Sequence, residues 1–156
     1  MKISVIVPAF NEERLIRQTL EKVRQAMTAF SDVGWTSELI VCDNNSTDRT
    51  AQLAIEAGAT VVFEPINQIS RARNCGAAAA SGQWLVFVDA DSQPSPALFA
   101  DMIEQIQTNR CLAGGSTIQL EGNDPMGVRV AKSWNWFSRV FRLLAGSFIF
   151  CKYTRF

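Results

Sequence analysis

The sequence predicts an α/β fold in which a mostly parallel sheet is flanked by helices. Short apolar runs typical of buried strands alternate along the chain with segments whose apolar residues recur at helical spacing. This alternation has the spacing of βαβ crossovers, which place neighbouring strands parallel. Three of the runs, residues 3–7, 38–42 and 84–88, each lead into a polar loop. The carboxyl ends of such strands form the ligand-binding edge of open α/β sheets.

The first strand is expected at residues 3–7, where Ile3-Ser4-Val5-Ile6-Val7 forms a largely apolar run. A helix is expected from about Glu12 to Phe30, because its apolar residues fall on one face at helical spacing. These residues are Leu15, Ile16, Leu20, Val23, Met27 and Phe30.

The second strand is expected at residues 38–42, within a largely apolar run. Ser46 or Thr47 follows it and is expected to cap a short helix, since both side chains can accept a hydrogen bond from a helix N-terminus. This helix is expected to end near Gly58. The brief apolar run 60–63 is then the third strand.

The third helix is expected at residues 70–81, an Ala-rich segment closed by Gly82. It leads into the strand 84–88, which is apolar throughout and therefore expected to be buried. Ser95 and Pro96 open the next helix, since proline is favoured at the first helical position.

The remaining elements are a strand at 114–120, a loop at 121–127, a basic helix over 128–145 and a last strand at 147–151. The basic helix is expected because apolar residues again recur at helical spacing. Four of them are aromatic, and two of these are tryptophans.

Composition narrows the possible functions. The 156 residues suit a single domain, and a hydrophobic content of 47% excludes a disordered chain. The absence of histidine excludes Ser-His and Cys-His nucleophiles and leaves oxygen ligands for any metal. Four widely spaced cysteines show no C-x-x-C pair, which favours a reduced, cytoplasmic setting. We expect neither a signal peptide nor a membrane span, because the N-terminus starts in a strand and no apolar stretch is long enough.

The charge distribution is uneven although the net charge is zero. Residues 126–156 carry six Lys and Arg side chains and no acid, so this segment is +6. A basic, Trp-rich amphipathic helix over 128–145 is typical of binding to the surface of an anionic membrane. The alternative is a helix that packs into the core and exposes its basic face to solvent. Nucleic acid is not an expected partner, because the basic residues are few and share one apolar helix.

Asp89 and Asp91, separated by Ala90, stand where the buried strand 84–88 ends. Two neighbouring carboxylates repel each other, and a divalent cation removes this repulsion. The sequence therefore favours a metal site at this position. The alternative is that both residues only form a turn and cap the helix that starts near Pro96.

Asp43 follows the second strand and can accept hydrogen bonds from a pyrimidine N–H or from ribose hydroxyls. The alternative is an N-terminal cap for the next helix. Glu12 and Glu13 fall at the expected start of the first helix, where the helix dipole alone explains one of them, and Glu12 is the candidate site residue.

Arg73 lies near the start of the third helix and can pair with a phosphate or stack on a base. Arg71 is a second candidate for this role, and either arginine could instead be a solvated helix residue. Asn74 is expected to tie a loop together.

Together these motifs resemble the nucleotide-binding half of family 2 inverting glycosyltransferases, which have the GT-A fold. The matching segments follow one another in the family's order over nearly the whole chain. They are Val7-Pro8-Ala9-Phe10-Asn11-Glu12-Glu13, Asp43-Asn44-Asn45-Ser46-Thr47-Asp48, Ala72-Arg73-Asn74 followed by Gly82, and Asp89-Ala90-Asp91. The resemblance implies that residues 1–120 form a nucleotide-sugar-binding part and that residues 121–156 begin an acceptor-side part of the same domain.

The resemblance also implies roles for individual residues. The segment from Pro8 through Phe10 to Glu12 would hold the nucleoside together with Asp43. The sequence Asp89-Ala90-Asp91 would meet the ribose and, through Mg²⁺ or Mn²⁺ bound by Asp91 and Asp89, the diphosphate. The donor would be a nucleotide-diphosphate sugar, with a UDP-sugar favoured.

The implied reaction is metal-assisted sugar transfer to an acceptor hydroxyl, with inversion at the anomeric carbon. The acceptor stays open, with lipids and polysaccharides among the candidates. The family's general base would lie beyond Phe156, so the chain is expected to be cut short. Glu121 or Asp124 is a conceivable substitute base within it, and the favoured alternative is that these loop acids are only solvated. The alternative function is a non-catalytic fragment that binds a nucleotide sugar or a partner. Uncovered apolar surface would also favour self-association and attachment to the inner face of the membrane.

Two other enzyme classes do not fit. A Rossmann dehydrogenase needs G-x-G-x-x-G after its first strand, and Pro8-Ala9-Phe10-Asn11-Glu12-Glu13 does not supply it. A nucleotidyltransferase would be expected to carry a Gly-rich loop with a lysine at the same place, which this segment lacks.

Overall fold

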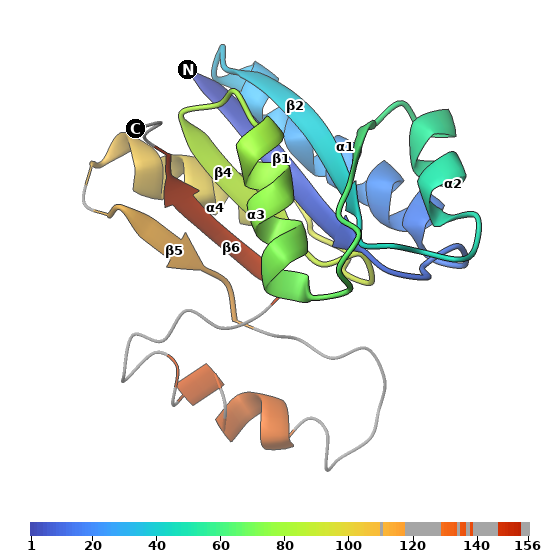
Figure 1. The fold of residues 1–156 in the computed structure, drawn as a ribbon. Coiled ribbons are helices and arrows are strands. Elements are labelled where there is room, and N and C mark those ends of the chain that lie inside the picture. The colour runs from blue at the N-terminus through green and yellow to red at the C-terminus, as the bar shows by residue number, and fades with distance from the viewer. Residues whose placement is uncertain (110, 118–128, 134, 137, 139–146, 154–156) are drawn as a thin grey trace.

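The computed structural model describes residues 1–109, 111–117, 129–133, 135–136, 138 and 147–153. The chain adopts the predicted α/β fold, in which a mixed sheet lies between helices (Figure 1). The named elements are, in chain order, β1 (Lys2–Ala9), α1 (Ile16–Asp32), β2 (Thr36–Asp43), α2 (Thr50–Glu56), β3 (Thr60–Phe63), α3 (Ile69–Ala79), β4 (Trp84–Val88), α4 (Pro96–Gln107), β5 (Ala113–Gly115) and β6 (Phe148–Lys152).

The strands of the sheet follow the order β3-β2-β1-β4-β6-β5. β1 pairs in parallel with β2 on one side and β4 on the other, and β3 extends the parallel part beyond β2. β6 pairs antiparallel with both β4 and β5. The prediction of a mostly parallel sheet is therefore confirmed. The carboxyl ends of β2, β1 and β4 lie side by side at one edge, which brings their loops together.

Helices cover both faces of the sheet. Figure 1 shows α3 in front of the sheet and α1 and α4 behind it. Alternate residues of β1 divide between the two faces: Val5 and Val7 join the core under α1 and α4, whereas Ile6 faces α3. Phe99 of α4 links helix to helix and helix to sheet, with ring-centroid distances of 5.2 Å to Phe30 and 5.5 Å to Phe148. This packing holds the binding edge on a rigid base.

The first helix begins later than the sequence predicts. It starts at Ile16 instead of Glu12, and Glu12 and Glu13 lie in the preceding loop. The carbonyl of Glu12 accepts hydrogen bonds from the N–H groups of Leu15 and Ile16, at 3.0 and 2.9 Å, which forms a single turn ahead of the helix. The dipole argument for Glu12 and Glu13 was therefore wrong, because neither residue belongs to the helix.

The second helix also begins later than expected. It starts at Thr50, its N-cap is Arg49, and the N-cap side chain makes no capping hydrogen bond. Ser46 and Thr47 were wrongly predicted to cap it. Asp48 instead makes the side-chain hydrogen bond at the start of the helix: its Oδ1 accepts from the backbone N–H of Thr50 at 2.9 Å.

Gly82 does not close the third helix. The helix ends at Ala79, and its C-cap Ala80 is in extended conformation. Glycine is required at position 82 because the chain passes close to β1: a Cβ there would lie 2.7 Å from the backbone nitrogen of Ser4. The N–H of Gly82 donates to Ser4 Oγ at 2.8 Å, so this glycine ties α3 and β4 to the start of β1.

The strand predicted at 114–120 is shorter than expected, since β5 ends at Gly115, and residues 118–120 lie outside the described part. The last strand is confirmed one residue further on, at Phe148–Lys152. Of the basic segment 128–145, residues 129–133, 135–136 and 138 are described and helical. The loop acids Glu121 and Asp124 lie outside the described residues. In the described part of the chain, no helix is long and apolar enough to cross a membrane.

Candidate functional site

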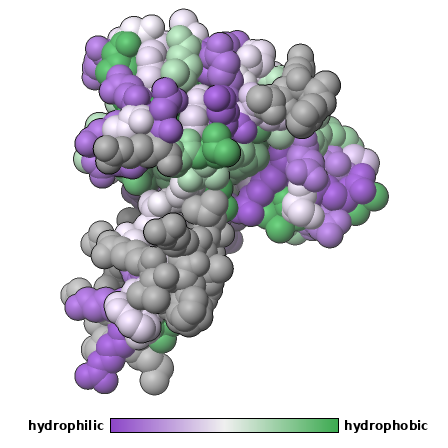
Figure 2. All heavy atoms as spheres, turned by 90° about the vertical axis from the view of Figure 1, so that its left-hand side faces the viewer, coloured by the Kyte–Doolittle hydropathy of each residue, from purple (hydrophilic) through white to green (hydrophobic). Residues whose placement is uncertain are grey.

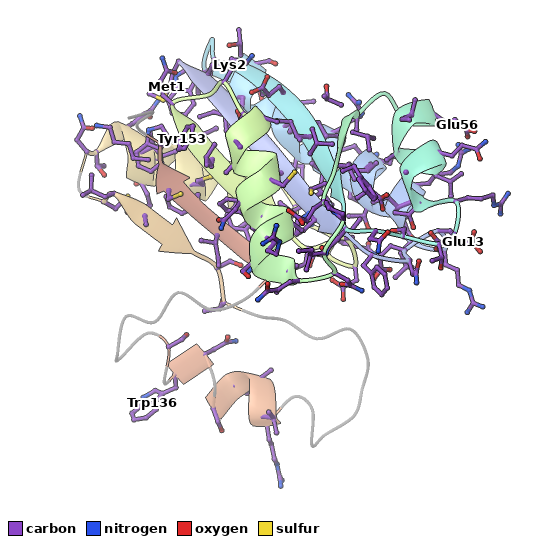
Figure 3. All side chains as sticks on the ribbon, viewed as in Figure 1. Met1, Lys2, Glu13, Glu56, Trp136 and Tyr153 are labelled. Carbon is purple, nitrogen blue, oxygen red and sulfur yellow. The ribbon has the colours of Figure 1, made fainter. Side chains whose placement is uncertain are left out.

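The loops that follow β1, β2 and β4 meet at one edge of the sheet. Ala9 and Asp43, the last residues of β1 and β2, are paired in register, and the N–H of Asn44 continues the pairing to the carbonyl of Ala9 at 2.8 Å. Figure 3 shows Glu13 beyond the carboxyl end of β1 and Lys2 at the opposite end of the same strand. The three polar segments singled out in the sequence therefore share one end of the molecule.

A set of hydrogen bonds locks the first loop to the second. Three successive backbone N–H groups, those of residues 11–13, donate to side chains of the loop after β2. The acceptors are Ser46 Oγ, Thr50 Oγ1 and Asp48 Oδ2, at 3.0, 2.8 and 3.0 Å respectively. In return, the N–H of Thr47 donates to Asn11 Oδ1 at 2.8 Å. The two loops therefore form one preorganised unit.

Asn11 allows the first loop to turn toward the second, because its backbone is in the left-handed region, with φ of 54°. Asparagine tolerates this region better than most residues. Pro8 lies just upstream and is buried within β1, whereas Phe10 follows the strand and is 43% exposed. Of the two, Phe10 is the side chain that a bound ligand can reach.

Asp43 is the last residue of β2 and is 6% exposed. Its Oδ1 accepts a hydrogen bond from the N–H of Ser46 at 3.1 Å, which closes a tight turn after the strand. Because α2 begins only at Thr50, Asp43 does not cap that helix. The capping alternative is therefore wrong, and the carboxylate is held in a fixed orientation at the end of β2.

Asp89 follows β4 directly, and its N–H donates to the carbonyl of Ser147 at 3.0 Å. The N–H of Ser92 then returns to the carbonyl of Asp89 at 3.0 Å, so Asp89-Ala90-Asp91 forms a turn. Within it Ala90 is buried and Asp91 is exposed. Ser95 Oγ caps α4 by accepting from Leu98 N at 3.2 Å. The carboxylates therefore do not cap that helix, contrary to the alternative.

Arg73 reaches from α3 to this turn. Its Nη2 lies 2.9 Å from Asp89 Oδ1, in an ion pair whose side chains are 29% and 32% exposed. The Nε of Arg73 is buried and has no hydrogen-bond partner among the described residues. Such an orphaned donor is costly unless a further acceptor arrives, and an anionic ligand supplies one.

Two other predictions about α3 have different outcomes. Arg71 pairs with Glu64, with Nε 3.0 Å from Oε1, and therefore has a partner of its own. Asn74 lies exposed inside α3 and, among the residues that the structure describes, ties no loop together, contrary to prediction. Of the two candidates, the structure favours Arg73, because it contacts Asp89 in the turn that also holds Asp91.

Negative charge is concentrated between the loops. Burial, and then repulsion from Asp91 and Asp48, raises the pKa of Glu12 above its usual range. Carboxylates from all three loops therefore lie close enough to influence one another. Within the described residues, no group of three acidic, Cys or His side chains forms a ready-made metal cage. Mg²⁺ needs no such cage, because it is commonly held by one or two carboxylates together with substrate phosphates. Asp91, exposed beside the paired Asp89, fits that mode of binding.

Several residues that build the site were not predicted to do so. Ser46, Asp48 and Thr50 accept hydrogen bonds from the first loop, and Thr19 of α1 donates to the carbonyl of Ala90. The sequence did offer one indication of this role, the high content of Ser, Thr and Asp at 46–50, because such side chains accept hydrogen bonds from nearby backbone N–H groups. Nothing in the local sequence marks Thr19, since its partner is distant along the chain.

Comparison with known proteins gives a family match over most of the chain. The profile described as glycosyl transferase family 2 matches residues 4–152. A dolichol-phosphate mannosyltransferase from Pyrococcus furiosus is 31% identical over 124 residues, which cover 74% of this chain and 33% of the relative. An uncharacterised glycosyltransferase, EpsJ from Bacillus subtilis, is 31% identical over 114 residues, covering 69% of this chain and 31% of the relative.

Solved structures agree with this family match. Glucosyl-3-phosphoglycerate synthase from Mycobacterium tuberculosis, in complex with Mn²⁺, UDP and glucosyl-3-phosphoglycerate, superposes with a TM-score of 0.71 at 26% identity. The match covers 97% of this chain and 56% of that one. The chain thus spans about a third of the length of these two curated relatives and just over half of the solved structure. With the profile matched from residue 4 to residue 152 and the GT-A architecture in place, the chain belongs to glycosyltransferase family 2.

Proposed function

We propose that this chain binds a nucleotide-diphosphate sugar at the carboxyl ends of β1, β2 and β4 and takes part in transferring the sugar to an acceptor hydroxyl. The observation that carries the proposal is the convergence of the three loops on Asp89-Ala90-Asp91, with the orphaned Nε of Arg73 beside it. A UDP-sugar is the favoured donor, because the similar synthase from M. tuberculosis was crystallised with Mn²⁺ and UDP-glucose.

Each residue has a role set by its place in the site. Asp43 accepts a hydrogen bond from the base or ribose, using the carboxylate that Ser46 orients. Phe10 and Glu12 border the nucleoside from the loop after β1, and Pro8, buried at the end of β1, supports that loop from below the ligand. Arg73 holds Asp89 through its ion pair and supplies a positive charge beside the turn that meets the diphosphate. Asp91, with Asp89 and Ala90 in the same turn, faces the phosphates.

Mg²⁺ or Mn²⁺, held by Asp91 with Asp89 beside it, would neutralise the charge on the departing diphosphate. The chain's own contribution is preorganisation, since the loops are fixed by hydrogen bonds before any ligand arrives. Inversion at the anomeric carbon would require a base that removes the acceptor's proton, and we assign no base among the described residues.

A thermal-shift screen tests the proposal directly. The purified chain is heated with a panel of nucleotide sugars, each with and without Mn²⁺. A ligand at a hundredfold excess over its Kd stabilises the folded state by about 2.7 kcal/mol. We expect UDP-sugars with Mn²⁺ to raise Tm more than any other combination. If no nucleotide sugar raised Tm, the proposal would fail. A second assay measures release of UDP when candidate acceptors are added. A rise in Tm without such release would limit the chain to donor binding.

A further inference from the structure

Thr19 of α1 makes an unusual contact for a helical threonine. It is 2% exposed, and its hydroxyl donates to the carbonyl of Ala90 at 2.6 Å, across a separation of 71 residues. Threonine in a helix usually bonds back to a carbonyl of its own helix. Thr28 of the same helix does this, donating to the carbonyl of Gln25 at 2.8 Å. Thr19 instead connects α1 with the turn after β4.

The contact fixes the centre of the carboxylate turn. Ala90 is 5% exposed, so its carbonyl points into the protein and requires a donor there. Asp89 has other anchors, through Ser147 and Arg73. For the peptide group between Ala90 and Asp91, the hydroxyl of Thr19 is the anchor. Because the peptide group is planar, fixing its carbonyl also fixes the amide nitrogen and Cα of Asp91, from which the side chain starts.

We infer that Thr19 is a positioning residue for the donor site, which orients Asp91 toward the diphosphate by holding the carbonyl of Ala90. The inference rests on the proposed function. It assigns Thr19 no contact with the ligand. Its effect should therefore appear in the affinity that depends on a divalent cation and not in the recognition of the nucleoside, which involves the loops after β1 and β2.

The test compares two substitutions at position 19 by isothermal titration calorimetry. Thr19→Val is nearly isosteric and removes the donor, whereas Thr19→Ser keeps it. Each variant is titrated with UDP with and without Mn²⁺, and with uridine alone. We expect Thr19→Val to weaken the Mn²⁺-dependent affinity for UDP by about tenfold or more, as loss of outer-shell partners does at metal sites. Thr19→Ser should restore most of it, and uridine affinity should stay unchanged throughout.

Two matched controls separate positioning from general destabilisation. Thr28→Val makes the same change at an exposed site of the same helix. Ser4→Ala removes a hydroxyl that is 0% exposed at the opposite end of the sheet, where it donates to Glu38. Ser4→Ala should lower Tm without changing the response to Mn²⁺. If Thr19→Val does not fold, Thr19→Ala removes the same donor without the second methyl group.

The outcomes distinguish this inference from the proposed function. Wild-type protein that binds neither UDP nor Mn²⁺ would contradict the proposed function. The inference alone would be overturned if the wild-type protein binds UDP with Mn²⁺ and a folded Thr19→Val or Thr19→Ala variant binds it with the same Mn²⁺-dependent affinity. An equal loss of uridine and UDP affinity in those variants would also overturn it, because it would mean that Thr19 serves only the fold.

Discussion

Asp43 is the residue whose place in the site is best determined by its own local structure. Its position at the end of β2 and its hydrogen bond from the N–H of Ser46 fix the orientation of the carboxylate at the edge of the sheet. The residue type and its place after an apolar run were enough to predict it as a candidate. The neighbour that orients it was not predictable, because Ser46 was expected to cap a helix that in the structure begins later, at Thr50.

Substituting Asp43 tests the nucleoside role. Asp43→Ala should weaken the binding of both UDP and uridine, with and without Mn²⁺, because the proposed hydrogen bond goes to the base or the ribose. Loss of a hydrogen bond to a charged group costs about 1.5 to 3 kcal/mol, equivalent to roughly a tenfold to hundredfold rise in Kd. Calorimetry with both ligands measures this. A loss seen only for UDP in the presence of Mn²⁺ would show that Asp43 does not contact the nucleoside.

At the scale of elements, β1, β2 and β4 and the starts of α3 and α4 were predicted closely, whereas the starts of α1 and α2 were not. Apolar runs define β1, β2 and β4 because burial dominates there. The starts of α1 and α2 depend on hydrogen bonds between loops that are distant in sequence, such as that from Glu12 N to Thr50 Oγ1 at 2.8 Å. A local pattern does not contain such contacts, so the predicted boundaries were too early.

At the end of the sheet opposite the site, Glu38 of β2 links neighbouring segments through hydrogen bonds and an ion pair. Its carboxylate accepts from Ser4 Oγ at 2.5 Å and from the N–H of Ser81 at 2.7 Å, and it lies 2.8 Å from Lys2 Nζ. Burial alone would raise the pKa of Glu38, but these donors outweigh it and lower the pKa to about 2. The charged carboxylate therefore stabilises the folded state, joining β1, β2 and the segment before β4.

This network predicts a specific dependence of stability on pH. Because the pKa of Glu38 is lowered on folding, its contribution is complete above the unfolded value of 4.5 and is lost as pH falls toward about 2. Glu38→Gln should lower the free energy of unfolding by about 1.5 to 3 kcal/mol at neutral pH. The difference from wild type should shrink between pH 4.5 and 2 in urea titrations. A constant difference across this range, or an equal loss in the exposed control Glu21→Gln, would contradict the assignment.

Gly82 supplies a second test at this scale. Gly82→Ala should destabilise the fold by about 1 to 3 kcal/mol, because the added Cβ meets the backbone of β1 and backbone atoms cannot rotate away. The distances that predict this are 2.7 Å to Ser4 N and 2.9 Å to Ile3 C. Chemical denaturation measures the change. A variant as stable as wild type would mean that the chain does not approach β1 this closely.

At the scale of the whole molecule, the fold class and the shared edge were predictable because strand alternation fixes the topology. The basic segment shows where sequence reasoning left a choice open. Its described residues are helical, and among the coloured residues at the lower end of the molecule in Figure 2 hydrophilic ones are exposed. Trp136 is 66% and Val130 62% exposed, and Figure 3 shows Trp136 pointing away from the sheet. This exposure favours a surface role for the segment over packing into the core.

We therefore propose that the segment 128–145 attaches the chain to anionic membranes. The chain should co-float with vesicles that contain anionic lipid at low salt and should be released at high salt, because residues 126–156 carry six basic side chains and no acid. Replacing Arg129 and Lys132 together by Gln should weaken this binding. Sedimentation of the same samples measures self-association. A chain that stays a monomer and does not bind anionic vesicles at low salt would contradict this proposal and the expected self-association.

The most direct test of the donor site is calorimetric titration of wild type and Asp91→Asn with UDP, with and without Mn²⁺. Repulsion from Asp91 contributes to the raised pKa of Glu12, so removing its charge should leave the fold at least as stable. We predict that Asp91→Asn keeps its Tm and its metal-independent affinity for UDP but loses the enhancement that Mn²⁺ gives to wild type. Unchanged Mn²⁺-dependent affinity in a folded Asp91→Asn would contradict the account, because Asp89-Ala90-Asp91 would then be only a turn.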